Sequence, residues 1–176
     1  MKVLRSLNVY GFDLDDIMYT VGEISTSIIA HRLAPLPAPP VFLETISTFE
    51  DPSTKSKGTA GGEILLVPES PLSPTLVYTA RRSDQSPLGD PIIIFSLDRD
   101  GKSPVLKREG ELRTGLKHVR GMAFSGGENN RYLIVGGLEG GGIKVFERLF
   151  GGVEFKEIAH LNERGRADEP DCFVWL

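Results

Sequence analysis

Cysteine, basic charge and long apolar runs are all scarce in this chain of 176 residues, and each scarcity argues against a class of protein. The single cysteine, Cys172, allows no internal disulfide, which favours a reducing compartment. The net charge of −4 provides no basic surface for nucleic acid. No apolar run approaches the roughly 20 residues of a membrane span, and the first residues lack the apolar segment of a signal peptide. We therefore expect a cytoplasmic protein that binds neither nucleic acid nor membrane.

Helical periodicity is also nearly absent, whereas glycine and proline are frequent, with 20 and 12 residues. The best helix candidate, Phe155–Asn162, is short and fits a strand equally well. This composition predicts an all-β fold in which many short strands are joined by tight turns.

One pattern recurs three times along the chain: an apolar strand with a tyrosine near its start, a polar or glycine-rich turn, and a strand rich in Ile or Val. In the middle copy the two strands are Leu76–Ala80 and Ile92–Leu97. The tyrosines of the three copies are 59 and 54 residues apart; they are Tyr19, Tyr78 and Tyr132. A repeat of this kind, with several strands in each unit, predicts the blades of a β-propeller.

We expect a partial propeller of about three blades, each with four antiparallel strands. The blade-like units cover about 1–47, 61–112 and 119–161, and a closing strand follows at 173–176. Because a ring needs about four to eight blades, three blades leave two apolar faces open. The chain is therefore expected to be a fragment of a longer protein, or to close by self-association as a homo-oligomer.

Four stretches resemble the lactonase-type seven-bladed propellers, a group that includes the 6-phosphogluconolactonases and the fungal carboxy-cis,cis-muconate cyclases. These stretches are Tyr19–Glu23, Thr59–Ile64, Val77–Ser83 and His118–Phe124. The long turn after Arg82 and the glycine-rich stretch in the third repeat make the resemblance greatest to the cyclases. The match covers only the C-terminal half of the family's ring, which places a further catalytic histidine upstream of Met1.

The resemblance implies intramolecular lactonisation of 3-carboxy-cis,cis-muconate in aromatic catabolism, without a metal or cofactor, and with the short chain inactive by itself. It implies that Glu23 donates a proton and that Arg82 binds a substrate carboxylate. Arg120 and Glu63 are further candidates for substrate binding. Arginine suits this task because its planar guanidinium binds a carboxylate bidentately and stays charged. A partly buried carboxylic acid suits proton transfer because burial tunes its pKa.

Two alternatives remain open. A 6-phosphogluconolactonase-type hydrolase would hold phosphate with the same arginines and activate water with a carboxylate. A non-catalytic propeller scaffold is the third interpretation, because a fold does not determine a function. In either enzyme, the expected partner is a small carboxylate or lactone substrate.

Several of these residues also have structural interpretations. Glu23 fits a solvated turn residue, and Glu63 fits a hydrogen-bonding residue at a strand start. We expect Arg81 to form a structural salt bridge, because neighbours in a strand point to opposite faces. His118 fits a surface or turn histidine, and Glu139–Gly142 fits a flexible hairpin turn.

Overall fold

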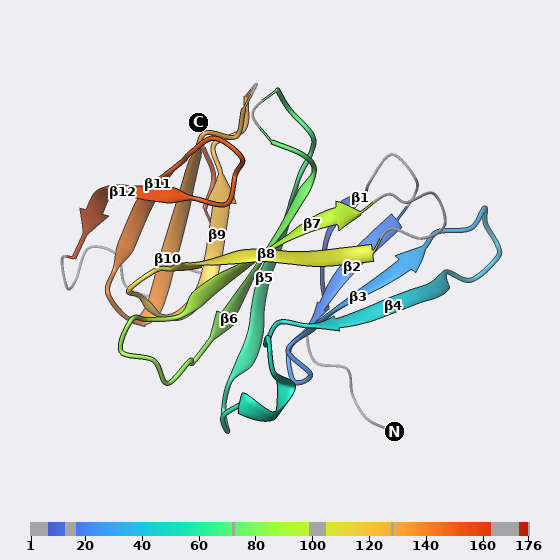
Figure 1. Ribbon diagram of the computed structural model, residues 1–176, viewed down its shortest axis with the longest axis horizontal. Helices are drawn as coiled ribbons and strands as arrows, with labels where there is room; N and C mark the ends of the chain where they lie inside the picture. The colour runs from blue at the N-terminus through green and yellow to red at the C-terminus, as the bar shows by residue number, and fades with distance from the viewer. Residues whose placement is uncertain are drawn as a thin grey trace.

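The computed structural model describes residues 7–12, 17–71, 73–98, 105–127, 129–162 and 173–175, and these form three four-stranded antiparallel sheets (Figure 1). The first sheet consists of β1 (Leu7–Phe12), β2 (Ile17–Gly22), β3 (Ser27–Arg32) and β4 (Val41–Ser47). The second consists of β5 (Ala60–Val67), β6 (Leu76–Arg82), β7 (Pro91–Asp98) and β8 (Val105–Arg113). The third consists of β9 (Lys117–Phe124), β10 (Tyr132–Gly140), β11 (Ile143–Arg148) and β12 (Phe155–Leu161).

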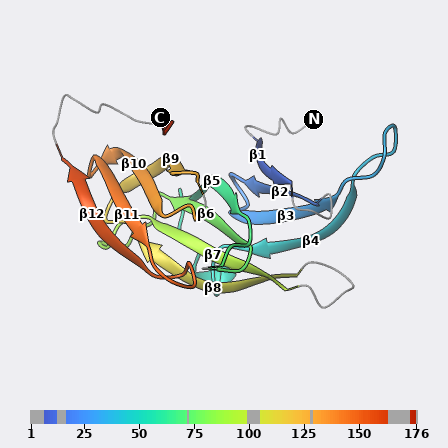
Figure 2. The same ribbon diagram turned by 90° about the horizontal axis from the view of Figure 1, so that it is seen from above.

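Within each sheet, strands that follow one another in the chain are also neighbours in space. Figure 2 shows the first strands β1, β5 and β9 along one side of the molecule and the last strands β4, β8 and β12 along the opposite side. The first strand of the middle sheet contacts the first strands of both other sheets. Sheets that converge on their first strands form a propeller. The predicted fold class is therefore confirmed: the chain is all-β and forms part of a β-propeller.

The middle sheet is packed on both faces, which explains the continuous apolar runs in its sequence. One face of this sheet forms a core with the first sheet, around Tyr19, Ile93 and Phe95. The other face forms a core with the third sheet, around Tyr78 and Ile94. Every side chain of β6 is buried, as are Pro91–Phe95 of β7. Each fully buried isoleucine contributes roughly 1.5–3 kcal/mol through removal of apolar surface from water.

Two details differ from the sequence prediction. Residues 173–175 have no regular secondary structure, so the expected closing strand at 173–176 is wrong over these residues; Cys172 and Leu176 lie outside the described residues. The indole of Trp175 instead donates a hydrogen bond to the carbonyl of Ala123 at 3.3 Å. Strand β10 continues to Gly140, so Glu139 belongs to a strand and only a tight turn remains. None of the described segments is a helix of the length and hydropathy needed to cross a membrane.

Candidate functional site

The ends of several strands meet where the three sheets come together. Glu23 directly follows β2, and Arg82 is the last residue of β6. Ala60, the first residue of β5, pairs with Arg82 in the sheet. The amide of the next residue, Gly61, donates a hydrogen bond to the carbonyl of Glu23 at 2.8 Å. This backbone contact brings the turn after β2 to the end of β6.

Two adjacent glycines allow β5 to touch both neighbouring sheets. A Cβ on Gly61 would lie 2.9 Å from the carbonyl oxygen of Gly22 in the first sheet. A Cβ on Gly62 would lie 2.9 Å from the carbonyl oxygen of Val119 in the third sheet. Only glycine permits so close an approach of two backbones. Because Glu63 follows Gly62 and Arg120 follows Val119, the contact brings these two predicted site residues to the same level of the molecule.

Arg82 links the three sheets through its side chain. Its Nη2 forms an ion pair with Oε1 of Glu23, and its Nη1 lies 3.2 Å from Nε2 of His118. The residue is only 8% exposed, and its Nε has no hydrogen-bond partner within the described part of the chain. A predominantly buried guanidinium is thus held in place by one partner from each neighbouring sheet.

The contact with Arg82 also determines which ring nitrogen of His118 accepts a hydrogen bond. A guanidinium can only donate hydrogen bonds, so Nε2 of His118 must accept. The proton of the neutral ring therefore lies on Nδ1, which is 2.9 Å from Oε1 of Glu139 and 3.3 Å from Oγ of Ser83. Arg82, His118, Glu139 and Glu23 form one continuous polar cluster, which we call the Arg82 cluster.

Glu63 has a different environment from Glu23. Its side chain is half-buried, and burial raises the pKa of its carboxyl group from 4.5 to about 7. Its carboxyl group forms no hydrogen bond or ion pair with the described residues that would offset this effect. Arg120 is exposed and likewise forms no ion pair with the part of the chain that the structure describes. Of the four predicted site residues, the structure therefore joins Glu23 and Arg82 directly, whereas Glu63 and Arg120 have no ion-pair partner among the described residues.

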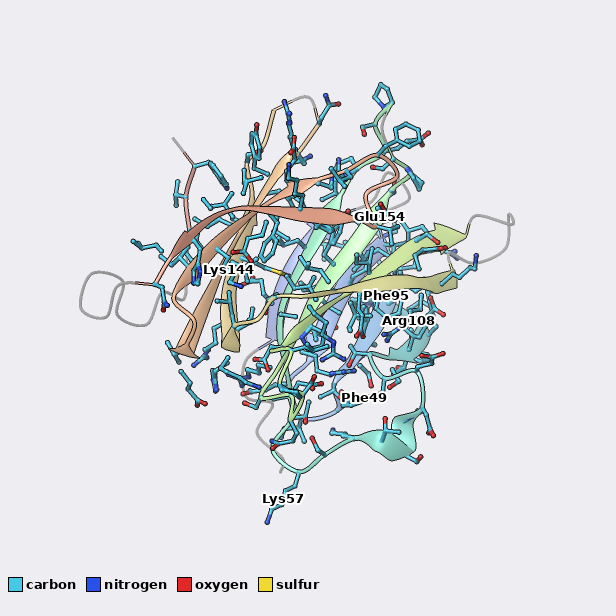
Figure 3. The ribbon with its side chains drawn as sticks, turned by 60° about the vertical axis from the view of Figure 1, so that its left-hand side comes forward. Phe49, Lys57, Phe95, Arg108, Lys144 and Glu154 are labelled. Carbon is cyan, nitrogen blue, oxygen red and sulfur yellow. The ribbon has the colours of Figure 1, made fainter. Side chains whose placement is uncertain are left out.

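The neighbouring arginine, Arg81, has the structural role that its position in the strand predicts. It forms a salt bridge with Asp84 at 2.8 Å, donates to the carbonyl of Thr48 at 3.0 Å, and lies 4.0 Å above the ring of Phe49. Arg108 donates to the same carbonyl at 2.8 Å, and Figure 3 shows Arg108 and Phe49 on the same side of the molecule. These contacts fasten the first sheet to the second.

Sequence reasoning missed the contribution of His118 and Glu139. His118 was expected to be a surface or turn residue, yet its ring is mostly covered and contacts Arg82. Its φ of +54° turns the backbone at this point, and only the fold reveals that geometry. The position of Glu139, before three glycines, predicts a turn, whereas the paired strand carries its carboxylate to His118.

A hollow of about 660 Å³ opens beside Glu23 and is lined by Ile24 and residues 55–60. The ammonium group of Lys55 is already bound to the carbonyl of Ile24, at 2.5 Å. Lys57 points away from the body of the molecule (Figure 3). No group of three metal-ligating side chains occurs among the residues described here. The hollow therefore gives solvent access to Glu23, and neither lysine ammonium is placed to bind a ligand there.

No protein-family model matches the chain, and no curated protein matches it in sequence. Its fold is similar to that of a candidate 6-phosphogluconolactonase of Bacteroides fragilis, with a TM-score of 0.66 and 22% identity over 96% of this chain and 40% of that one. It is also similar to the fold of the periplasmic gluconolactonase of Pseudomonas aeruginosa, with a TM-score of 0.69 and 17% identity over 94% of this chain and 40% of that one. A protein of Lactobacillus plantarum matches with a TM-score of 0.70 and 13% identity over 96% of this chain and 43% of that one.

These similarities establish the fold, because identity is low in every case. The chain spans about two fifths of the length of the solved propellers that it matches.

Proposed function

We propose that this chain forms one side of a lactone-hydrolysing site in a propeller ring. The observation that carries the proposal is Glu63, a half-buried carboxyl group with a pKa of about 7 that forms no hydrogen bond or ion pair with the described residues. A general base is most effective when its pKa lies near the working pH. The names of the solved structures from B. fragilis and P. aeruginosa, a candidate 6-phosphogluconolactonase and a gluconolactonase, support this choice of reaction.

Hydrolysis assigns a role to each predicted site residue. The carboxylate of Glu63 takes a proton from a water molecule as its oxygen bonds to the lactone carbonyl carbon. The ring C–O bond then breaks, and the same proton passes from Glu63 to the departing ring oxygen, which yields a hydroxy acid. Arg120, whose guanidinium has no ion-pair partner among the described residues, binds the carbonyl oxygen or an anionic group of the substrate.

Arg82 and Glu23 act together in this scheme. Arg82 supplies a fixed positive charge beside the substrate, and a charge in a partly desolvated site stabilises an oxyanion more strongly than it would in water. Glu23 and His118 occupy two of its donor nitrogens, so they hold the guanidinium in one orientation. The substrate expected for such a site is a lactone with an anionic or polyhydroxylated chain.

Carboxy-cis,cis-muconate cyclase activity is the narrower prediction, and the same residue makes it testable. Ring closure needs a proton delivered to carbon, and a carboxyl group with a pKa of about 7 is still half protonated at neutral pH. Glu63 would then act as the acid in place of Glu23, which is already engaged with Arg82. In aromatic catabolism the substrate would be 3-carboxy-cis,cis-muconate.

The test uses the native protein and its Glu63→Gln variant, each recovered with antibodies against this chain from cells of the source organism that carry the corresponding gene. Acid release from δ-gluconolactone at pH 7 is compared with spontaneous hydrolysis, and loss of the conjugated-diene absorbance of 3-carboxy-cis,cis-muconate is followed in parallel. Accelerated acid release that disappears in Glu63→Gln supports the hydrolase, whereas loss of diene absorbance alone identifies the cyclase. No turnover of either compound contradicts both and favours the non-catalytic scaffold.

The assembly that completes the ring is a separate prediction. The first and third sheets each pack against the middle sheet, and the described residues place no further sheet on their other faces. An immunoblot band well above the computed 19.3 kDa would show that further blades belong to the same polypeptide. A band at that mass, with a larger native mass in sedimentation, would show a homo-oligomer. Fractionation of the same cells tests the cytoplasmic location.

A further inference from the structure

Asp90 is completely buried, and its carboxylate accepts three backbone hydrogen bonds. Oδ2 accepts from the amides of Ser83 and Val119, each at 3.0 Å, and Oδ1 accepts from the amide of Asp84 at 2.8 Å. The backbone of Asp90 is also fully used. Its amide donates to the carbonyl of Leu116 at 2.8 Å, and its carbonyl accepts from the hydroxyl of Thr114 at 2.7 Å.

The positions of two of these donors are informative. Ser83 directly follows Arg82, and Val119 directly follows His118. Ser83 and His118 both have left-handed backbone conformations, with φ of +58° and +54°. Such a conformation is unfavourable for residues with a side chain and persists where surrounding contacts enforce it. One carboxylate oxygen thus fixes the backbone beside each of two members of the Arg82 cluster.

The two bonds also cross a boundary between sheets. Arg82 belongs to the middle sheet and His118 to the third, and their side chains meet at 3.2 Å. Without a shared anchor, small movements between the sheets would change this distance directly. The Oδ2 atom of Asp90 is such an anchor, because both backbone amides point to the same atom.

We propose that Asp90 is a positioning residue that sets the register between Arg82 and His118, and thereby the tautomer of His118. This inference rests on the proposed function insofar as the Arg82 cluster serves catalysis. A competing interpretation limits Asp90 to ordering the loop 83–90, in which Asp84 also accepts a hydrogen bond from the amide of Ser86 at 2.9 Å. Loop ordering needs the bond to Asp84 and does not need the bond to Val119.

The experiment compares Asp90→Ala with Asp84→Ala, a control in the same loop whose side chain pairs with Arg81 and Arg113. Alanine is used because the amide oxygen of an asparagine would still accept from both Ser83 and Val119. The readout is the pair of ¹⁵N shifts of the His118 ring, which report which nitrogen carries the proton. We expect the Nδ1-protonated form in the wild type and in Asp84→Ala, and a mixture of tautomers with unchanged sheet content in Asp90→Ala. A wild-type ring signature in a folded Asp90→Ala protein overturns the proposal.

Two further measurements keep the test decisive. If Asp90→Ala fails to fold, the wild-type protein is examined for scalar coupling across the hydrogen bond between the Val119 nitrogen and the Asp90 carboxyl carbon; its absence overturns the proposal. A comparison of turnover separates positioning from function. We expect the variant at Asp90 to turn over substrate about 100-fold more slowly than the wild type, as for a catalytic group displaced by about 1 Å. A changed tautomer in a protein whose wild type has no turnover would refute the proposed function and leave the positioning role intact.

Discussion

Arg82 and His118 come from different sheets, yet Nη1 of the arginine lies 3.2 Å from Nε2 of the histidine, and the arginine can only donate. Nε2 of the histidine therefore accepts, which directs the Nδ1 side of the ring toward Glu139. Glu23 secures the other side of the same guanidinium. The side chain at the centre of the predicted site is thus oriented before any ligand arrives, which is the requirement for electrostatic catalysis.

Replacement of Arg82 tests this orientation. Arg82→Lys keeps a positive charge but cannot contact Glu23 and His118 through two nitrogens of one planar group. We expect turnover to fall by about 100-fold in Arg82→Lys and at least as much in Arg82→Ala. Steady-state kinetics of the native protein provide the measurement. Full activity in Arg82→Lys would show that charge alone is sufficient and that the planar geometry is irrelevant.

Arg81 provides a contrast one residue away. It is 6% exposed and is used in contacts between the first two sheets. Arg81→Met removes these hydrogen bonds and leaves the carbonyl of Thr48 bound to Arg108 alone. We expect a loss of about 1–3 kcal/mol in the free energy of unfolding by urea, with the KM and kcat of any turnover by the folded protein unchanged. Altered kinetics at unchanged stability would place Arg81 in the site.

Gly62 tests the close approach of the middle and third sheets. A Cβ in Gly62→Ala meets the Val119 carbonyl at 2.9 Å and the Ala80 Cβ at 3.2 Å, so the backbone must shift. We expect a loss of about 1–3 kcal/mol in unfolding free energy. Gly110→Ala is the matched control in a strand, because its Cβ meets only the Val153 Cγ1, at 2.9 Å. Equal costs in the two variants would argue against a backbone contact at Gly62.

The pKa of Glu63 predicts how stability depends on pH. Its value is raised from 4.5 to about 7 in the folded protein, so the folded state binds the proton more tightly than the unfolded state. The resulting stabilisation is fully present below about pH 4.5 and is lost as the pH rises through about 7. Glu63→Gln should remove this part of the pH dependence, and the exposed Glu154→Gln control should retain it. Urea midpoints from pH 4 to 8 measure the difference, and identical profiles for Glu63→Gln and the wild type would refute it.

The sequence predicted the architecture well because burial leaves a clear pattern. The run of isoleucines in β7 is continuous since both faces of the middle sheet are covered. The resemblance to lactonase-type propellers also singled out Arg82 and Glu23, but nothing in the sequence states that a strand end and a turn 59 residues apart are in contact. That contact depends on the packing of one sheet against another.

The residues that sequence reasoning missed share a physical cause. His118 and Ser83 acquire their roles from left-handed backbone turns, and Asp90 acquires its role from amides that only the fold brings together. The expected strand at 173–176 rested on apolar character alone, and no partner strand pairs with its described residues, 173–175. Local pattern predicts strands, whereas contacts between blades require the three-dimensional arrangement.

The central claim is that Glu63 is a carboxyl group tuned to act near neutral pH, and its own titration tests that claim most directly. The ¹³C shift of its side-chain carboxyl carbon is followed by NMR from pH 3 to 9, with Glu63→Gln used to assign the signal. We predict a midpoint at about pH 7. A midpoint near the ordinary value of 4.5 would contradict the account, because Glu63 would then be a solvated carboxylate with no special fitness as a base.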